Sequence, residues 1–287
     1  MPVVSDSSIA DRRGVRSAKA LIEELARFDA FGRASERLEL AIDGHDPVPV
    51  FVNEFWTARQ RAGHPIHEVS YRACFKPALP RFFIERLTRP GALVYDPFMG
   101  RGTTLIEAVL LGRRAAGCDI NPVARVMVEP RLRPPSIEAV EARLDALQLE
   151  WTGEVWEELL VFYHPETLRE LTALRRYFLD RAAAETLDDV DRWIRMVAVN
   201  RLTGHSPGFF SVYTLPPNQA VTIESQERIN RKRDQKPPYR DVRTLIRRKS
   251  RQLLKTPLPV SSLLTRERAL LIQGSADATP QLADETV

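Results

Sequence analysis

The sequence is poor in cysteine and, for its length, in glycine. Only two cysteines and 13 glycines occur among its 287 residues, whereas glycine averages about 7% of residues in soluble domains. Cys74 and Cys118 are too few and too far apart for a disulfide framework or a cysteine metal site. No apolar run reaches the roughly 18 residues that a membrane span requires. These absences exclude a disulfide-rich scaffold and leave no candidate for a membrane-spanning helix.

The first residues, MPVVSDSSIADRRG, lack the apolar core of a secretory signal. The chain contains 28% charged and 44% hydrophobic residues, a composition that argues against disorder and provides ample material for a core. We therefore expect a cytoplasmic protein with reduced thiols, folded as one large domain or two modest ones.

Two features are concentrated locally. Residues 228–255 contain 12 lysines and arginines against two aspartates, so this segment carries +10 while the remainder of the chain carries −6. Five of the 13 glycines lie within residues 91–117, namely Gly91, Gly100, Gly102, Gly112 and Gly117. A function for this chain has to explain both the glycine cluster and the basic segment.

Residues 92–120 show the pattern of a strand, a helix and a second strand. ALVYD (92–96) and AAGCDI (115–120) are short apolar runs with an acid at or near the end, and TTLIEAVLLGRR (103–114) has helical spacing. Short apolar runs of this kind are typical of buried parallel strands. The pattern therefore predicts an α/β fold built on a parallel sheet.

Most of the remaining chain is expected to be helical. Helical spacing occurs over residues 21–31 and 78–88, and between 125 and 205 in IEAVEARLDAL, WEELLVFY, TLRELTALRRYFL and VDRWIRMVAVNRL. The other expected elements are extended chain at 48–56, a loop at 206–222, a helix at 241–254 and a third buried strand within ALLIQGSADA (269–278).

The turn between the first predicted strand and its helix is a candidate ligand site. In DPFMGRGTTLIEA (96–108), Gly100 and Gly102 allow a sharp turn, and the start of the helix presents free N–H groups. Asp119 follows about 20 residues later, where an acid can accept hydrogen bonds from ribose hydroxyls. No GK[ST] follows, which excludes a P-loop, and the dinucleotide fingerprint lacks its third glycine. Asp96 suits an amino group better than a phosphate.

These motifs resemble those of the DNA amino-methyltransferases, which methylate N4 of cytosine or N6 of adenine. The matching residues are DPFMGRGTT followed by EA, GR, G-x-D and NP, together with the upstream segment SYRACFKPALPRFFIERL (70–87). The resemblance covers residues 68–125. It implies an α/β, Rossmann-like AdoMet-dependent methyltransferase fold, complete or incomplete, with a large and mainly helical insertion.

The resemblance also implies S-adenosyl-L-methionine (AdoMet) as the cofactor. Phe75, Lys76 and Pro77 would lie at its methionine moiety. The amino-acid and sulfur portion would be lined by Asp96, Gly100, Gly102 and Thr103, and the ribose would be bound by Asp119. In this family the acid that recognises adenine directly follows a glycine, but here Ser275 follows Gly274, so Asp277 or Ser275 would take this part. The predicted cofactor residues are Phe75, Lys76, Pro77, Asp96, Pro97, Phe98, Gly100, Gly102, Thr103, Thr104, Asp119, Ile120 and Asp277.

The catalytic motif of this family, a D/N/S-P-P-Y/F/W loop that holds the amine of a flipped base, is not found. Lys236-Pro237-Pro238-Tyr239 begins with a lysine, which cannot accept an amine hydrogen. TLPPN (214–218) has neither an acceptor before its prolines nor a stacking ring after them. Both are interpreted as loop prolines, and the catalytic residues stay unknown.

The order of elements offers an explanation. In this family the third strand leads through a short connector into the catalytic loop, and residues 278–287 resemble that connector. We therefore expect a truncated reading frame, a fragment, or a subunit of a split enzyme whose second chain supplies the catalytic motif.

The basic segment is expected to contact DNA. Arginines recur at helical spacing in DVRTLIRRKSRQLLK, and INRKRDQKPPYR adds cations on a flexible loop. Such a face suits phosphates, whereas the alternative is an ordinary helix face whose charges balance acids elsewhere in the fold. His164 and His205 are interpreted as cap or core residues. The predicted DNA-binding residues are Arg231, Lys232, Arg233, Arg243, Arg247, Arg248 and Arg251.

Four regions are expected: an N-terminal helical and extended lead (1–67), an AdoMet-binding core (68–124), a helical insertion that recognises DNA (125–268), and a third core strand with its truncated connector (269–287). The expected function is site-specific DNA methylation in a restriction-modification system, by direct methyl transfer from AdoMet and without a metal. The alternatives are a non-catalytic subunit that binds DNA and AdoMet and is completed by a partner chain, and an RNA amino-methyltransferase.

Overall fold

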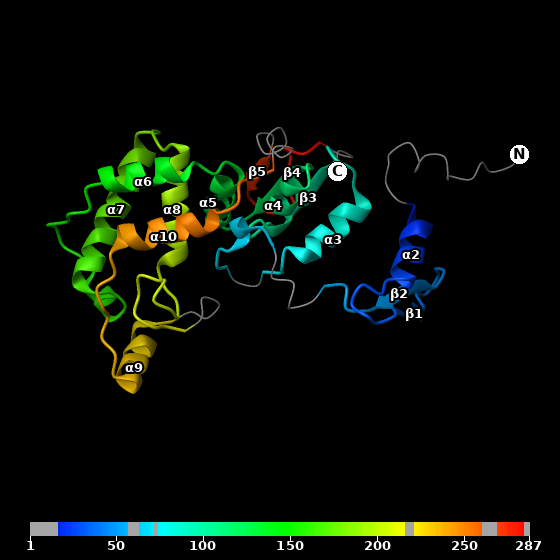
Figure 1. Cartoon of the computed structure of the whole chain (residues 1–287), viewed down its shortest axis with the longest axis horizontal. Coiled ribbons are helices and arrows are strands. Elements are labelled where there is room, and N and C mark those ends of the chain that lie inside the picture. Colours follow the sequence, from blue (N-terminus) through cyan, green and yellow to red (C-terminus); the bar gives the residue numbers. More distant parts are fainter. Residues whose placement is uncertain (1–16, 57–62, 72–73, 216–220, 260–268, 284–287) are drawn as a thin grey trace, which may run out of the picture.

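The computed structural model of the chain describes residues 17–56, 63–71, 74–215, 221–259 and 269–283. Helices predominate, and two small sheets lie among them (Figure 1). A hairpin of β1 (Glu36–Leu40) and β2 (Val48–Val52) lies with α2 (Ala18–Ala26) at one end of the molecule. The second sheet lies near the middle, and a group of helices forms the other end.

The central sheet consists of three parallel strands in the order β3–β4–β5. β3 (Leu93–Asp96) and β4 (Arg114–Asp119) are joined through α4 (Thr103–Leu110), and β5 (Leu270–Gln273) pairs with the other edge of β4. The predicted strand–helix–strand unit and the third strand are therefore confirmed, and the fold is mixed α/β with a small parallel sheet. α4 ends at Leu110, near Gly112 as the sequence predicts, because Gly112 has a φ of +73°, a left-handed conformation that ends helices.

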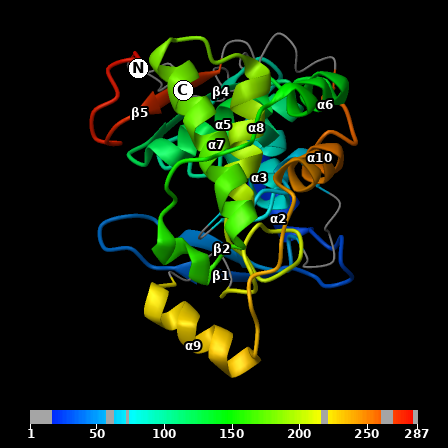
Figure 2. The same ribbon diagram turned by 90° about the vertical axis from the view of Figure 1, so that its left-hand side faces the viewer.

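The helical end of the molecule shares one hydrophobic core with α4. Trp193 is fully buried in α8 (Asp189–Arg201) and donates through Nε1 to Ser250 Oγ of α10 (Val242–Leu253), at 3.0 Å. His164 caps α7, since its Nδ1 accepts from the N–H of Glu166 at 3.2 Å, which confirms the cap interpretation of this histidine. Figure 2 shows this end of the molecule, which is formed by α5 (Pro122–Leu132), α6 (Ile137–Ala146), α7 (Pro165–Ala183), α8 (Asp189–Arg201) and α10 (Val242–Leu253).

Two local predictions are wrong. WEELLVFY is not an α-helix, because only Glu157–Val161 forms a short 3-10 helix, η2. α7 begins at Pro165, and a residue that precedes a proline is held extended, which leaves too little chain for another α-helix. The stretch INRKRDQKPPYR was expected to be a flexible loop, but its first residues form the last turns of α9 (Ile223–Arg233). Thr222 caps the start of this helix, and Asp234, with a φ of 46°, ends it.

Candidate functional site

Three strand ends meet at one edge of the central sheet. Asp96 is the last residue of β3, Asp119 is the last residue of β4, and Gln273 is the last residue of β5. In the parallel register, Asp96 pairs with Gly117 and Asp119 pairs with Gln273. Residues 97–102, which we call the glycine loop, cross this edge before α4 begins. The two aspartates therefore end neighbouring strands beside the glycine loop, as the sequence predicts.

The carboxylate of Asp119 holds the glycine loop in place. Its Oδ2 accepts from the N–H of Gly100 at 2.8 Å, and its Oδ1 accepts from the N–H of Asn121 at 2.8 Å. Asp96 Oδ1 accepts from the N–H of Phe98 at 3.0 Å. Each carboxylate oxygen has two lone pairs, so both side chains keep the capacity to accept hydrogen bonds from a ligand.

Gly102 is required by the packing of α5. Its φ is +72°, and a Cβ atom built on it would lie only 2.5 Å from Cγ2 of Val128 on α5. The loop turns sharply here, and α5 approaches the backbone more closely than any side chain permits. Helix packing therefore explains this glycine.

Two large apolar side chains are exposed at the same edge. Phe98 is 78% exposed and Ile120 is 76% exposed, and each lies within two residues of a strand-ending aspartate. Exposed apolar groups beside polar acceptors are typical of a site for a ligand with a flat apolar part and polar groups around it. The edge therefore fits a nucleoside-like ligand.

Tyr71 is a residue of this site that the sequence analysis missed. A Cβ atom on Gly100 would lie 3.4 Å from the Tyr71 ring, and the Tyr71 hydroxyl accepts from Nδ2 of Asn121 at 3.4 Å. Burial, together with the carboxylate of Asp119, raises the pKa of Tyr71. Tyr71 therefore lies between the glycine loop and the end of β4. It belongs to the SYRACFKP segment, whose resemblance to the family marks the region but does not single out this residue.

Arg101 ties that segment to the glycine loop. Its guanidinium donates to the backbone carbonyls of Val69 at 2.8 Å and Phe75 at 3.1 Å, and to Oγ1 of Thr103 at 3.0 Å. Arg131 of α5, which is fully buried, donates in turn to the carbonyl of Arg101. The sequence analysis missed both arginines, because a motif that places Arg101 between two glycines does not say which carbonyls it reaches.

A buried polar cluster lies behind the glycine loop. His67, the last residue of the 3-10 helix η1 (Pro65–His67), donates through Nε2–H to Oε1 of Glu107 on α4 at 2.7 Å. Oε2 of Glu107 accepts from Nε of Arg81 at 2.9 Å, and Arg81 lies on α3 (Ala78–Leu87). His67 is 4% exposed and Glu107 is fully buried. The cluster therefore fixes α4 against both η1 and α3.

We expect His67 to make the protein sensitive to acid. Burial lowers the pKa of the His67 ring below its ordinary value of 6.5, and this effect outweighs the opposing attraction of Glu107. Below about pH 6.5 the unfolded chain then binds the proton that the folded ring refuses, so the free energy of unfolding falls as the pH falls. Between pH 7.5 and 5.5, urea titrations should show His67→Gln losing less stability than the wild type.

The exposed His45 is the control for this measurement. His45→Gln should lose stability between the two pH values as the wild type does. An equal loss in His67→Gln would show that His67 is not the group that titrates.

The other residues predicted to bind the cofactor are distributed around this edge. Phe75 and Thr104 line an apolar hollow of about 310 Å³ beside β3. Lys76 and Pro77 directly precede α3, and Thr103 begins α4, where its side chain is buried. Asp277 is exposed after β5 and lies near this edge, since Asp119 and Asp277 both act on the buried thiol of Cys118, whose pKa is raised mainly by burial.

The arginines of α10 are used mainly within the fold. Arg251 forms an ion pair with Glu141 at 2.6 Å, and Arg247 pairs with Asp145. Arg243 donates to the carbonyls of Leu144 and Leu147, and Arg248 is exposed. These contacts hold α10 against α6. They agree with the alternative interpretation, in which the charges of this helix face balance acids elsewhere in the fold. Contact between these arginines and DNA stays a prediction.

The last turn of α9 presents a different arrangement. Arg231, Lys232 and Arg233 are all exposed, and among the residues that the structure describes none of them forms an ion pair with an acid. The guanidinium of Arg233 lies 3.8 Å from the centre of the Tyr213 ring. α9 projects from the body of the molecule in both views (Figures 1 and 2).

Tyr239 of the Lys236–Tyr239 sequence has a structural contact. Its hydroxyl donates to Oε1 of Glu170 on α7 at 2.6 Å, and this hydrogen bond raises its pKa. The contact supports the interpretation of this sequence as a loop. Pro216, Pro217 and Asn218 of the other proline pair lie outside the described residues.

Among the described residues, no helix has both the length and the apolar character that crossing a membrane requires. In the same part of the chain, His, Cys, Asp and Glu side chains form no group of three or more that could hold a metal ion.

The sequence that forms this edge is similar to a known family. Residues 29–128 match the DNA methylase family of N6 and N4 methyltransferases. This segment contains β1 to β4, α3, α4 and the first part of α5, and with them the glycine loop, Asp96 and Asp119. The match confirms the resemblance to the DNA amino-methyltransferases that the motifs indicate.

The curated proteins that this chain resembles are Type II methyltransferases. M.MjaII of Methanocaldococcus jannaschii is 34% identical over 83 residues, which are 29% of this chain and 15% of the relative. M.MvaI of Kocuria varians is 34% identical over 132 residues, 45% of this chain and 27% of the relative. M1.MboII of Moraxella bovis is 54% identical over 46 residues, 15% of this chain and 18% of the relative.

The chain thus spans about a quarter or less of the length of these relatives. None of the solved structures matches it significantly.

Proposed function

We propose that this chain binds AdoMet as part of a DNA amino-methyltransferase that methylates N4 of cytosine or N6 of adenine. One observation carries the proposal: Asp96 and Asp119 end neighbouring parallel strands beside a glycine loop. Parallel sheets bind nucleotide-like ligands at this kind of edge. The segment that builds the edge lies within the residues that match the DNA methylase family, which supports this ligand over other nucleotides.

The residues at the edge fit AdoMet in their chemistry. Asp119 has lone pairs left for ribose hydroxyls, and Asp96 suits the ammonium group of the methionine moiety. Phe98 and Ile120 offer exposed apolar surface to a purine ring. We assign the remaining contacts to Phe75, Lys76, Pro77, Pro97, Gly100, Gly102, Thr103, Thr104 and Asp277.

AdoMet supplies a methyl group that is bonded to a positively charged sulfonium sulfur. The exocyclic amine of a base accepts this methyl group. The work of this chain is to bind and orient the cofactor. Asp119 holds the N–H of Gly100 and so fixes the glycine loop, and Arg101 keeps the Val69–Phe75 segment against it. Two carboxylates near the cofactor also favour its positive charge.

We further propose that the edge belongs to a Rossmann-like core (68–124 and 269–287) with a helical insertion (125–268) and an N-terminal lead (1–67). DNA contact is assigned to the basic segment, with the last turn of α9 as its most accessible part, because those cations are exposed and form no ion pair with any acid that the structure describes. The relatives are Type II methyltransferases, which supports a role in restriction-modification and a cytoplasmic location.

The 287 residues contain no D/N/S-P-P-Y/F/W sequence. This observation favours a second candidate function, a DNA- and AdoMet-binding subunit whose catalytic loop comes from a partner chain. Under either proposal, the described residues bind the cofactor and do not hold the target amine.

Calorimetric titration tests the cofactor proposal directly. The wild type should bind AdoMet. Asp119→Ala should raise the dissociation constant on the order of 30-fold, because the variant loses both the acceptor for the ribose and the acceptor for the Gly100 N–H. Asp43, which is exposed in the loop between β1 and β2, provides the matched control, and Asp43→Ala should bind as the wild type does. A folded wild type that does not bind AdoMet, or an Asp119→Ala variant of unchanged affinity, would refute the proposal.

A further inference from the structure

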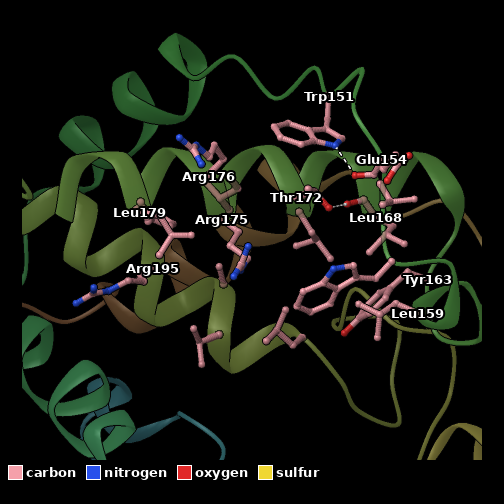
Figure 3. A pocket seen from close by; sticks show the side chains of 18 of the residues that line it. Trp151, Glu154, Leu159, Tyr163, Leu168, Thr172, Arg175, Arg176, Leu179 and Arg195 are labelled. Atoms are coloured by element: carbon pink, nitrogen blue, oxygen red, sulfur yellow. Dashed lines mark hydrogen bonds between the residues drawn. The ribbon is translucent and has the colours of Figure 1, made fainter. Parts of the chain in front are cut away.

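A large apolar groove lies in the helical end, away from the strand ends that form the candidate site. It has a volume of about 750 Å³. Figure 3 shows the groove from close by, with α7, α8 and the chain around Trp151–Tyr163 forming its sides. None of the predicted cofactor or DNA residues lines it. Neither the glycine loop nor the basic segment therefore explains it.

The groove is long. Its lining on α7 runs from Leu168 to Ala182, and at a rise of 1.5 Å per residue this distance is about 21 Å. A helix of about four turns has the same length. A compact small molecule would use only part of such a groove, whereas an α-helix laid along it would use all of it.

Several large apolar side chains that line the groove are exposed to solvent. Trp156 is 68% exposed, Leu179 is 47% exposed and Leu202 is 38% exposed, although all three lie at the groove. Exposed apolar side chains that are contiguous and line a groove are typical of a surface that binds a partner. The apolar face of an amphipathic helix is complementary to such a surface.

The groove is lined by four charged side chains, three arginines and one glutamate, and two of the arginines have no ion-pair partner among the described residues. Arg175 lies with its guanidinium 5.5 Å from the centre of the Trp156 ring, and Nε of Arg195 is buried without a hydrogen-bond partner. Neither arginine forms an ion pair with an acid in the part of the chain that the structure describes. Glu154 is the one acid in the lining, and Arg176 already pairs with Asp180 at 2.9 Å. The charge that complements these arginines is negative.

We propose that the groove between α7 and α8 binds an amphipathic α-helix of a partner protein, with an apolar face toward the leucines and acidic residues toward Arg175 and Arg195. Duplex DNA is also acidic, but interfaces with DNA are polar and strongly cationic over their whole area. Here most of the lining is apolar and only three arginines and Glu154 carry charge, which favours a helix.

Two synthetic peptides test the proposal. Both are fluorescently labelled 18-residue helices with leucines at helical spacing along one face, and they differ only in carrying glutamates or lysines beside that face. Fluorescence anisotropy with the full chain should show that the glutamate peptide binds and that the lysine peptide binds at least tenfold more weakly. Tryptophan emission should shift to the blue with the glutamate peptide, because Trp156 becomes buried.

Charge reversal locates the binding site. The double variant R175E/R195E should bind the glutamate peptide about tenfold more weakly and should prefer the lysine peptide. R175E alone changes an exposed residue and should weaken binding of the glutamate peptide if the double variant does not fold. The control is R192E, because Arg192 also lies on α8 but pairs with Asp189 and does not line the groove. R192E should bind both peptides as the wild type does.

Three results would overturn the proposal. The wild type could bind both peptides equally or bind neither. The charge-reversed variants could keep the preference of the wild type. A 20-base-pair duplex could displace the glutamate peptide from the wild type but not from R175E, in which case DNA is the occupant of the groove.

Discussion

Replacing Glu107 with alanine is expected to lower the free energy of unfolding by about 3–5 kcal/mol. Glu107 is fully buried, and its two carboxylate oxygens accept hydrogen bonds from His67 and Arg81. Without it, the N–H of His67 is buried without an acceptor and the guanidinium of Arg81 loses its buried partner. Polar groups that are buried and unpaired are costly, which is why the expected loss exceeds that of a surface pair.

Glu85 offers a matched control for this measurement. It also pairs with Arg81, through Nη1 at 3.4 Å, but its side chain is 44% exposed. Urea unfolding should therefore show a loss of at most about 0.5 kcal/mol for Glu85→Ala. Similar losses in the two variants would mean that burial does not set the strength of the Glu107 contacts.

Replacing Gly102 with alanine is expected to cost about 2–4 kcal/mol and to abolish AdoMet binding. Alanine at a φ of +72° costs about 1 kcal/mol. The added Cβ would also lie 2.5 Å from Val128, and overpacking of this kind costs about 1–3 kcal/mol. α5 would have to move away from the glycine loop. Thermal unfolding and calorimetric titration of AdoMet measure the two effects separately.

Two further variants separate backbone strain from collision. Gly112 has a φ of +73°, but a Cβ atom there would meet nothing within 4 Å, so Gly112→Ala should cost only the strain of about 1 kcal/mol. Val128→Ala makes room beside position 102. Gly102→Ala should therefore be less harmful in a Val128→Ala background than in the wild type. Additive losses in the double variant would show that the contact with Val128 is unimportant.

Much of the strand arrangement could be predicted from the sequence. LVYD and AAGCD are short apolar runs that end in acids, and the glycines between them allow little other than a turn into a helix. Because parallel strands align their ends, Asp96 and Asp119 were expected at one edge, and the structure has them there. The local pattern is sufficient here because the strands and their helix are close together in the chain.

The contacts of the basic segment could not be predicted in the same way. Arg247 and Arg251 lie one helical turn apart on α10, and their partners Asp145 and Glu141 lie one turn apart on α6. About a hundred residues separate the two helices, and periodicity within either one says nothing about which acids the other presents. Arg131 shows the same limit, since its buried donors reach backbone carbonyls that no side-chain pattern reveals.

The place of β5 in the sheet has a consequence for how the chain folds. β3, α4 and β4 are contiguous in the sequence, so they can come together by closing short loops. β5 can join β4 only after the chain between Asp119 and Leu270 has been made and brought back, and closing a long loop costs more conformational entropy than closing a short one. The pairing of β4 with β5 therefore has a higher contact order than the pairing of β3 with β4. The assembly of the β5 side, which Asp277 follows, depends on the helices between Asp119 and Leu270.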